Sequence, residues 1–373
     1  MKRILIAFLL TLVPIAGAQV YRITDLGPLS PTAINAWGQV VGDYNGHAYM
    51  WTKFAGLRAL GTLQGGTFSS AAGINDLGVV TGYADGQGVA VASIQCVDLT
   101  QPFIWNPRSG MQGLGTVDFF GPTYACGIPF YGTGINASGE VVGFNEDFAT
   151  YQYAFVWTQH AGMSLFGGSF SPTRANAVNN VGEIVGQNET LFLHIGHAAA
   201  WTNAGSTITD LGTLAGPDLA CGSLATAVND NGQVVGASYV LGDLCNIDSS
   251  GEEVFHAVLW TPGGQIRDLG TLAGDIYSIG LKINFFGQVI GSSGSTVTVD
   301  VFSGPKGMIH VIGRPFIWSQ RSGMRDLNTL ISPYSGWILN TAADINVWGQ
   351  IVGSGTLNGQ PHGFLLTPRR WSQ

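Results

Sequence analysis

The sequence has few charged side chains, few cysteines and no excess of basic residues. Charged residues make up 10% of the 373 residues, and 15 Lys and Arg stand against 23 Asp and Glu, for a net charge of -8. A nucleic-acid-binding protein needs a basic surface and a coiled coil needs many charges, so the composition argues against both classes. No Gly-x-Ser-x-Gly elbow, paired-His zinc motif or phosphate-binding loop occurs. The sequence therefore contains no recognisable catalytic signature.

Long hydrophobic runs are also missing, except for one at the start of the chain. Lys2 and Arg3 precede the apolar run 4–15, and small residues follow it as far as Ala18. This pattern is typical of a secretory signal peptide, and the run is too short to span a bilayer. We expect residues 1–18 to be a signal peptide cleaved near Ala18, no membrane span, and a secreted protein that is extracellular or periplasmic.

What the sequence does contain is one pattern repeated seven times. Each unit has an Ile/Val-Asn-x-x-Gly element with a Val/Ile pair and Gly, an apolar run that usually ends in Trp, and an element similar to Asp-Leu-Gly-Thr-Leu. The repeat Asn residues are Asn35, Asn75, Asn136, Asn179, Asn229, Asn284 and Asn346. A period of roughly 40–60 residues with several strand-like runs indicates a propeller or another repeat array.

Each unit divides into four strand-length runs, which we name a to d in chain order. Strand a ends at the repeat Asn, strand b contains the Val-rich pair, strand c ends in Trp, and strand d contains Asp-Leu-Gly. In the a–b turn, Asn and Gly are expected to tolerate positive φ. The repeated Trp is expected to be buried between neighbouring sheets.

The two ends of the chain complement each other. The mature sequence opens with a d-like strand, Tyr21–Leu26, and stops after a c-like strand, Gly363–Leu366. Pairing these strands would close a ring and remove two open sheet edges. The sequence thus predicts one all-β domain over residues 19–373, a seven-bladed β-propeller of four-stranded antiparallel blades that is closed by the N-terminal strand.

Five units also contain His-Ala-Phe or a close variant of it at the start of strand c. These runs are His47-Ala48-Tyr49, Tyr153-Ala154-Phe155, His197-Ala198-Ala199, His256-Ala257-Val258 and His362-Gly363-Phe364. Over essentially the whole mature chain, the repeat resembles the HAF-repeat extracellular proteins. The resemblance implies secretion and a repeat fold, and it supplies no catalytic residue. Units two, three and six depart from the family at the His position.

The connections between strands predict a binding face. In an up-and-down blade, the short a–b and c–d turns share one face, the bottom, and the long and variable b–c and d–a connections share the other, the top. Many acidic residues fall in these top-face loops, and an acidic face favours cations or neutral polar ligands. Calcium is therefore a possible bound ion, although no cofactor motif occurs. The alternative is that the acidic residues only keep the loops solvated. The candidate ligand-binding acids are Glu146, Asp147, Asp243, Asp248, Glu252 and Glu253.

Cysteine and histidine both receive structural interpretations. All four cysteines fall in top-face loops, and an exported protein with an even count favours disulfides, which we predict as Cys96–Cys126 and Cys221–Cys245. Equivalent histidines on different blades lie at least about 10 Å apart. They therefore cannot converge on one metal ion, no metal site is predicted, and we expect them to cap strand c by bonding to loop backbone.

Two further positions vary around the ring. Two residues before the repeat Asn, five blades have Ala or Gly, but the last two have Lys282 and Asp344. We predict an ion pair at the channel axis, the alternative being that the two charges bind a channel ligand. On the bottom face, the a–b turns of neighbouring blades form an apolar arc, which is either a contact surface or a plug of the channel. The arc consists of Phe286, Trp348, Trp37 and Leu77.

Together these features predict a secreted, non-catalytic propeller that binds an extracellular glycan or protein surface through its top face, or that serves as a scaffold. The alternative is a carbohydrate-active hydrolase or lyase that uses top-face carboxylates. Propellers host enzymes as well as binding modules, so the fold does not choose between the two functions. No nucleic-acid partner is expected.

Overall fold

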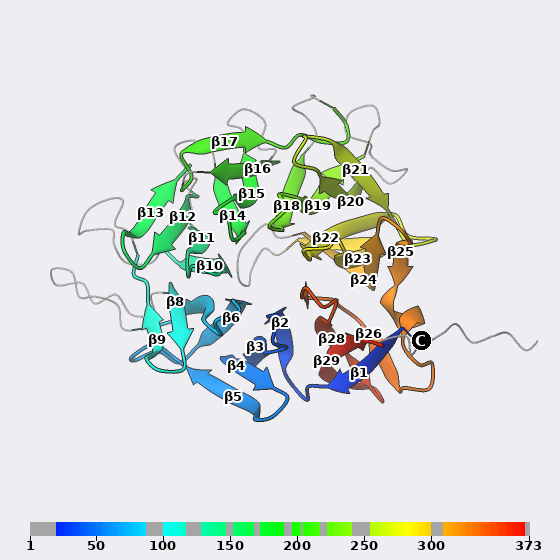
Figure 1. Cartoon of the computed structure of the whole chain (residues 1–373), viewed down its shortest axis with the longest axis horizontal. Coiled ribbons are helices and arrows are strands. Elements are labelled where there is room, and N and C mark those ends of the chain that lie inside the picture. Colours follow the sequence, from blue (N-terminus) through cyan, green and yellow to red (C-terminus); the bar gives the residue numbers. More distant parts are fainter. Residues whose placement is uncertain are drawn as a thin grey trace, which may run out of the picture.

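The computed structural model describes residues 20–86, 100–116, 128–146, 152–167, 172–189, 196–202, 204–216, 222–240, 254–299 and 309–369. Their strands form seven antiparallel sheets arranged around a central axis (Figure 1). The predicted seven-bladed β-propeller is confirmed. In these ranges the only helical segment is the short 3-10 helix η1 (Leu327–Leu330), and no helix is long and apolar enough to cross a membrane.

Blades one to six each contain four consecutive strands, with strand a innermost. Blades one to three are β2 (Ser30–Ile34), β3 (Val40–Tyr44), β4 (His47–Thr52) and β5 (Gly56–Gly61); β6 (Ser69–Ile74), β7 (Val80–Ala84), β8 (Gln101–Asn106) and β9 (Gly110–Gly113); and β10 (Phe130–Ile135), β11 (Val141–Asn145), β12 (Ala154–Thr158) and β13 (Gly162–Phe166). Blades four to six are β14 (Thr173–Val178), β15 (Ile184–Glu189), β16 (Gly196–Thr202) and β17 (Thr207–Asp210); β18 (Ser223–Val228), β19 (Val234–Tyr239), β20 (Phe255–Trp260) and β21 (Ile266–Gly270); and β22 (Tyr277–Ile283), β23 (Val289–Val299), β24 (Ile309–Ser319) and β25 (Gly323–Asp326).

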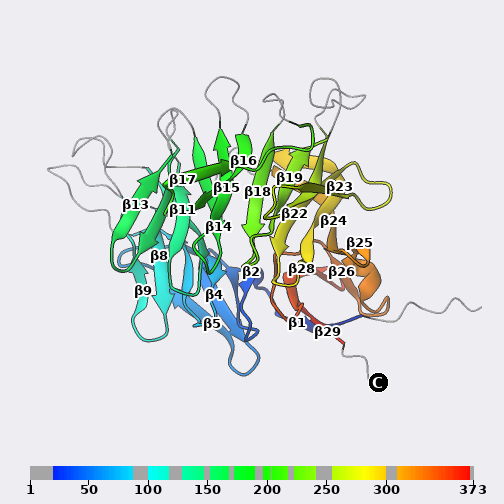
Figure 2. The same cartoon turned by 45° about the horizontal axis from the view of Figure 1, so that its top comes forward.

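Blade seven is built from both ends of the chain. Its strands are β26 (Trp337–Leu339) and β27 (Asp344–Ile345), which both pair with β28 (Ile351–Leu357), followed by β29 (Gln360–Pro368) and β1 (Tyr21–Asp25). Strand β1 is antiparallel to β29, with Tyr21 opposite Pro368 and Asp25 opposite Phe364, and Figure 2 shows the two strands side by side. The predicted closure by the N-terminal strand is confirmed.

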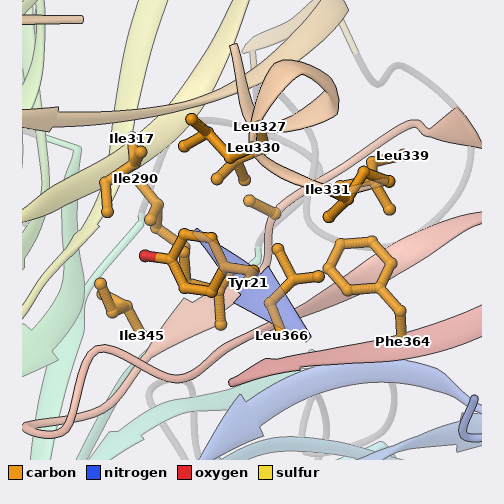
Figure 3. Packing of buried hydrophobic residues seen from close by; sticks show 12 residues of the cluster. Tyr21, Ile290, Ile317, Leu327, Leu330, Ile331, Leu339, Ile345, Phe364 and Leu366 are labelled. Atoms are coloured by element: carbon orange, nitrogen blue, oxygen red, sulfur yellow. The ribbon is translucent and has the colours of Figure 1, made fainter. Parts of the chain in front are cut away.

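Apolar side chains between neighbouring sheets form the core. Where blades six and seven meet, Tyr21 packs with Ile290, Leu330 and Phe364 (Figure 3). Burial raises the pKa of Tyr21 to about 12, since the phenolate would lose its hydration there. The expected burial of the repeated Trp is confirmed at four positions, where at most 5% of the residue is exposed, and two more are half-buried. The four are Trp105, Trp201, Trp260 and Trp318, and the two are Trp51 and Trp157.

The repeat Asn residues join the blades into a hydrogen-bonded ring. The Nδ2 group of each Asn donates to the main-chain carbonyl of the Asn in the next blade, from Asn35 to Asn75 and onwards until Asn346 donates to Asn35. These seven bonds are 3.0–3.2 Å long. All seven Asn side chains are buried, and we refer to them as the Asn ring.

The expectation for the a–b turn is half right. Positive φ occurs at the Gly three residues after the Asn, as at Gly38 (φ 73°), and not at the Asn itself. The Oδ1 atom of Asn35 instead accepts the N–H groups of Trp37 and Gln39 at 3.1 and 3.0 Å. The Asn thus closes its own turn with its oxygen and contacts the next blade with its nitrogen, which is why a buried amide is tolerated here.

Candidate functional site

A cavity of about 440 Å³ lies in the channel on the top side, where strands a begin and strands b end, and we refer to it as the upper cavity. Sites for small molecules typically measure about 300–1,000 Å³. Its wall includes residues near the start of strand a, namely Ser70, Tyr131, Arg174, Leu224 and Ile279. In blades one to four, the residue that follows the repeated Gly of strand b also lines the upper cavity. These residues are Asp43, Tyr83, Phe144 and Gln187.

A β-bulge in strand a supplies a third set of lining residues. In blades one to six the pairing of strands a and b shifts by one residue at the position three before the repeat Asn. A bulge redirects the side chain at the extra residue, and here that side chain lines the upper cavity. The bulge residues are Thr32, Ala72, Thr133, Asn176, Thr226 and Leu281.

The polar bulge residues hold neighbouring blades together. Thr32 donates to the Ala71 carbonyl at 2.7 Å, and Asn176 donates to the Ala225 carbonyl at 2.7 Å. Thr133 and Thr226 make the same contact to their next blades at 2.8 and 2.6 Å. The spacing of the blades is therefore fixed directly at the cavity wall, so the cavity is preformed.

Asp43 begins a chain of hydrogen-bonded groups along blades one to three. Its carboxylate accepts from the Ser70 hydroxyl at 2.7 Å and the Ala71 N–H at 2.9 Å, and Ser70 also bonds to Tyr83. The Tyr83 and Tyr131 rings meet edge to face, with centroids 4.9 Å apart. Burial raises the pKa of Asp43 despite the bonds from Ser70 and Ala71, and it raises the pKa of Tyr83.

The chain continues from Tyr131 to Arg174. Tyr131 is hydrogen-bonded to Glu146, and burial, followed by the Glu146 charge, raises the pKa of the phenol. The Arg174 Nη2 atom lies 3.8 Å from the Glu146 carboxylate, and its Nε donates to Gln152 at 3.0 Å. The guanidinium lies 4.6 Å from the centroid of Phe144, a distance that favours a cation–π contact. This wall therefore offers hydroxyl groups and aromatic surfaces in fixed positions.

The wall formed by blades five and six differs. Leu224, Ile279 and Leu281 make most of it apolar. Its polar residues are Thr226, His310 and the half-buried Lys282. The upper cavity is thus divided into a polar and aromatic side and an apolar side with one ammonium group.

The predicted ion pair at the axis does not form as a direct contact. In the part of the chain that the structure describes, no ammonium–carboxylate distance of 4.0 Å or less joins Lys282 and Asp344. The Asp344 carboxylate accepts instead from the N–H groups of Ile34 and Ile345 at 2.9 and 2.8 Å. Burial raises the pKa of Asp344, while the charge of Lys282 and these two bonds act in the opposite direction. The two charges therefore attract each other at longer range.

Of the six acids predicted on the top face, the structure describes Glu146, which lies beside the upper cavity. Asp147, Asp243, Asp248, Glu252 and Glu253 lie outside the described residues. So do Cys96, Cys126, Cys221 and Cys245, and both disulfides remain predictions. Within the described ranges, no three His, Cys, Asp or Glu side chains are placed to hold a metal ion.

Three of the four repeated His residues bond to a carboxylate, whereas the sequence predicted bonds to loop backbone. His197 Nδ1 lies 2.9 Å from the Asp210 carboxylate, and His256 Nδ1 lies 3.0 Å from that of Asp268. His362 makes the same contact to Asp25 at 2.8 Å. In each case the Asp belongs to the Asp-Leu-Gly element of strand d in the same blade, so the repeat pattern pairs the two motifs.

The apolar arc on the bottom face is exposed to solvent. The exposed fractions are 77% for Trp37, 75% for Leu77, 71% for Phe286 and 67% for Trp348. Each indole N–H donates to a carbonyl of the next turn at 2.9 Å, Trp37 to Asp76 and Trp348 to Ala36. The plug interpretation is wrong, because these bonds hold the rings across the turns and leave most of their surface in water.

Sequence reasoning missed most of the residues that line the upper cavity. Asp43, Tyr83, Tyr131 and Arg174 are not among the candidate residues that the sequence indicated. A usable signal was present, since every blade has the strand b Gly but the residue after it differs through blades one to five. That residue is Asp43, Tyr83, Phe144, Gln187 and Ala237 in turn. Such variation within a repeat is expected where the repeat faces a ligand.

Comparison with known proteins identifies the fold and no family. No family model matches the chain, and no curated protein matches it. An oligogalacturonate lyase in complex with manganese has 12% sequence identity and a TM-score of 0.52, with 95% of each chain covered. Virginiamycin B lyase from Staphylococcus aureus has 7% identity and a TM-score of 0.50, with 94% of this chain and 100% of that chain covered.

A third similar structure is a chain of the mitotic checkpoint complex, with 11% identity, a TM-score of 0.50, and 96% of this chain and 98% of that chain covered. At such identities the likeness extends to the propeller fold alone. Because lyases and a checkpoint assembly share this fold, function has to be argued from the upper cavity.

Proposed function

We propose that this chain is an exported, non-catalytic binding module that takes part of an extracellular glycan into its upper cavity from the top face. The observation that supports this most is the division of one preformed cavity into aromatic, hydroxyl-bearing and apolar walls. A sugar ring presents hydroxyl groups around its edge and C–H groups on its faces. The rings of Tyr83, Tyr131 and Phe144 provide apolar surfaces for the faces, and the groups beside them can bond to the hydroxyls.

The repeats support a binding role for this part of the channel. Blades that share the Asn ring have different residues at the cavity wall: Asp43, Tyr83, Phe144 and Gln187 occupy one equivalent position. Core packing or closure of the ring would require no such difference. A ligand without sevenfold symmetry would.

The proposal is tested on a glycan array with the chain from Gln19 onwards, with and without calcium. Ala72 is half-buried and lines the upper cavity, so Ala72→Phe places a large ring in it. Ala59 is exposed on the outer strand β5, and Ala59→Phe is the matched control. We expect the wild type and Ala59→Phe to bind the same glycans and Ala72→Phe to lose them at an unchanged melting temperature. Equal binding by all three proteins, or no glycan bound by any, would contradict the proposal.

A second candidate function, carbohydrate cleavage, is favoured by one observation. Two carboxylates, Asp43 and Glu146, lie in or beside the upper cavity, each hydrogen-bonded to a hydroxyl group of the wall. Burial also raises the pKa of Asp43, as a general acid requires. Incubation of any bound glycan with the wild type and with Asp43→Asn separates the two functions. Product formed by the wild type alone would identify an enzyme. An unchanged glycan would support the binding module.

A further inference from the structure

Lys282 is a charged side chain on the wall of the upper cavity. At the equivalent position, blades one to five have Ala or Gly, so the fold does not require a long side chain there. Lys282 lines the upper cavity among Leu224, Ile279 and Leu281. Within the described part of the chain its ammonium group has no hydrogen-bond or ion-pair partner. Charged groups in such confined surroundings are ordinarily paired.

The neighbouring Asp344 balances this charge without occupying the ammonium group. Asp344 is half-buried, and its carboxylate accepts from the N–H groups of Ile34 and Ile345. Lys282 acts on it only through the longer-range attraction that opposes the rise in its pKa. None of the described residues therefore occupies the three N–H donors of Lys282, which can donate to a ligand.

We infer that the ligand of the upper cavity is an acidic sugar whose carboxylate binds Lys282. The inference rests on the proposed function and names its ligand class. One carboxylate fits better than a group with two charges, because Arg174, the other Lys or Arg side chain among the described lining residues, is already engaged by Glu146, Gln152 and Phe144. With the carboxylate at Lys282, the sugar ring faces the polar and aromatic wall of blades one to four, where its hydroxyl groups find partners.

Two probes that differ in one group test the inference, namely glucuronate and glucose, with binding measured by saturation-transfer NMR and calorimetry. We expect glucuronate to bind the wild type at least tenfold more tightly than glucose. Lys282→Gln should lower glucuronate affinity by about 10- to 100-fold, the range for a hydrogen bond to a charged group, and leave glucose binding unchanged. Asp344→Asn should raise glucuronate affinity about two- to fivefold, since it removes a repelling charge.

The outcomes separate this inference from the proposed function. Equal affinity for glucose and glucuronate, or tight glucuronate binding that persists in Lys282→Gln, would overturn the acidic-sugar inference and leave a glycan-binding cavity. Binding of neither probe, together with an array on which no glycan is bound, would overturn both. Thermal unfolding of both variants verifies that each is folded, and opposite changes in affinity for Lys282→Gln and Asp344→Asn are not expected from a general loss of structure.

Discussion

The two halves of the channel belong to the same seven blades, but their residues repeat differently. Near the bottom, the Asn ring places one residue type at all seven equivalent positions and joins each blade to the next with the same bond. Near the top, the equivalent positions that line the upper cavity have acidic, aromatic, amide and aliphatic side chains in successive blades. The lower half thus follows the symmetry of the ring, whereas the upper half breaks it.

This difference indicates which positions of the repeat stabilise the ring and which are available for binding. Closure makes the same demand on every blade, because each sheet must join a neighbour on both sides, and the Asn ring makes this join with the same bond in all seven blades. Recognition of an asymmetric ligand makes a different demand on each blade. We therefore expect substitutions in the lower half to change stability and substitutions in the upper half to change binding.

The largest effect is expected when the ring itself is opened. Deletion of residues 20–27 removes β1 and its five backbone pairs with β29, and with it Tyr21, a buried member of the core cluster between blades six and seven. We expect loss of cooperative unfolding in urea, followed by circular dichroism, because β29 becomes an unprotected edge. Arg22→Ala, an exposed change in the same strand, is the control and should unfold like the wild type. A truncated chain with the wild-type midpoint would contradict the role of closure.

The next largest effect is expected within the Asn ring. Asn229 donates to Asn284 and Gln233 and accepts from the N–H groups of Asn231 and Gln233. Asn229→Ala should lower the free energy of unfolding by about 2–5 kcal/mol, since it leaves buried polar groups without partners. The control is Asn231→Ala, which removes one exposed bond to the Phe285 carbonyl and should cost less than about 1 kcal/mol. Similar losses in the two variants would show that the ring is not the stabilising feature.

A smaller effect on the free energy of unfolding is expected from a change of pH. Two carboxylates should contribute to it with opposite signs. Burial raises the pKa of Asp43, so its contribution to stability is present below about pH 4 and is lost as the pH rises through its folded-state pKa. At Asp268, burial alone would raise the pKa, but bonds from His256 and the Gly270 N–H outweigh it and hold the pKa below its ordinary value. Its contribution is therefore present at neutral pH and is lost as the pH falls through that lowered pKa.

Two variants measured between pH 2 and 7 check these signs. Asp43→Asn should be as stable as the wild type or more stable at pH 7, with the advantage vanishing in acid. Asp268→Asn should be less stable at pH 7, by about 1 kcal/mol or less because the side chain is 41% exposed, and should approach the wild type in acid. Parallel pH profiles for the two variants would refute the assignment.

The smallest effect on stability is expected on the bottom face. The double variant Trp37→Ser and Trp348→Ser removes two exposed rings and two exposed hydrogen bonds. We expect a loss of about 1 kcal/mol or less in the free energy of unfolding. If the apolar arc is a contact surface, sedimentation velocity should also show less self-association than in the wild type. A loss of several kcal/mol in the free energy of unfolding would instead show that the two rings stabilise the fold.

Features that repeat could be predicted from the sequence, and features that depend on neighbouring blades could not. The blade count, the buried Trp residues and the pairing of β1 with β29 all follow from repeated patterns and from the unmatched strands at the two ends. The Asn ring was missed because the Nδ2 partner of Asn35 is Asn75, forty residues away, and lies near only once the blades are arranged. The bulge was missed because one extra residue in strand a leaves the spacing of the repeat unchanged.

The site could be predicted only in outline. The choice of the top side agrees with the position of the upper cavity, and Glu146 is next to it. The residues that form the cavity wall come into contact across blades: Asp43 bonds to Ser70 in the next blade, 27 positions along the chain. The contacts of His197, His256 and His362 with an Asp of strand d could not be predicted from either motif alone, because they depend on the register between strands c and d.

Closure by β1 also sets an order of events during folding. The contact of His362 with Asp25 joins residues 337 positions apart, and the pairs of β1 with β29 span a similar separation. Contacts between such distant residues form late, because the entropy of the intervening chain must be lost first. Six blades can assemble from consecutive strands as they become available, but the seventh waits for both ends. Until then β29 keeps an open edge that another extended chain can occupy, so the last step of folding is also the step at which this protein competes with aggregation.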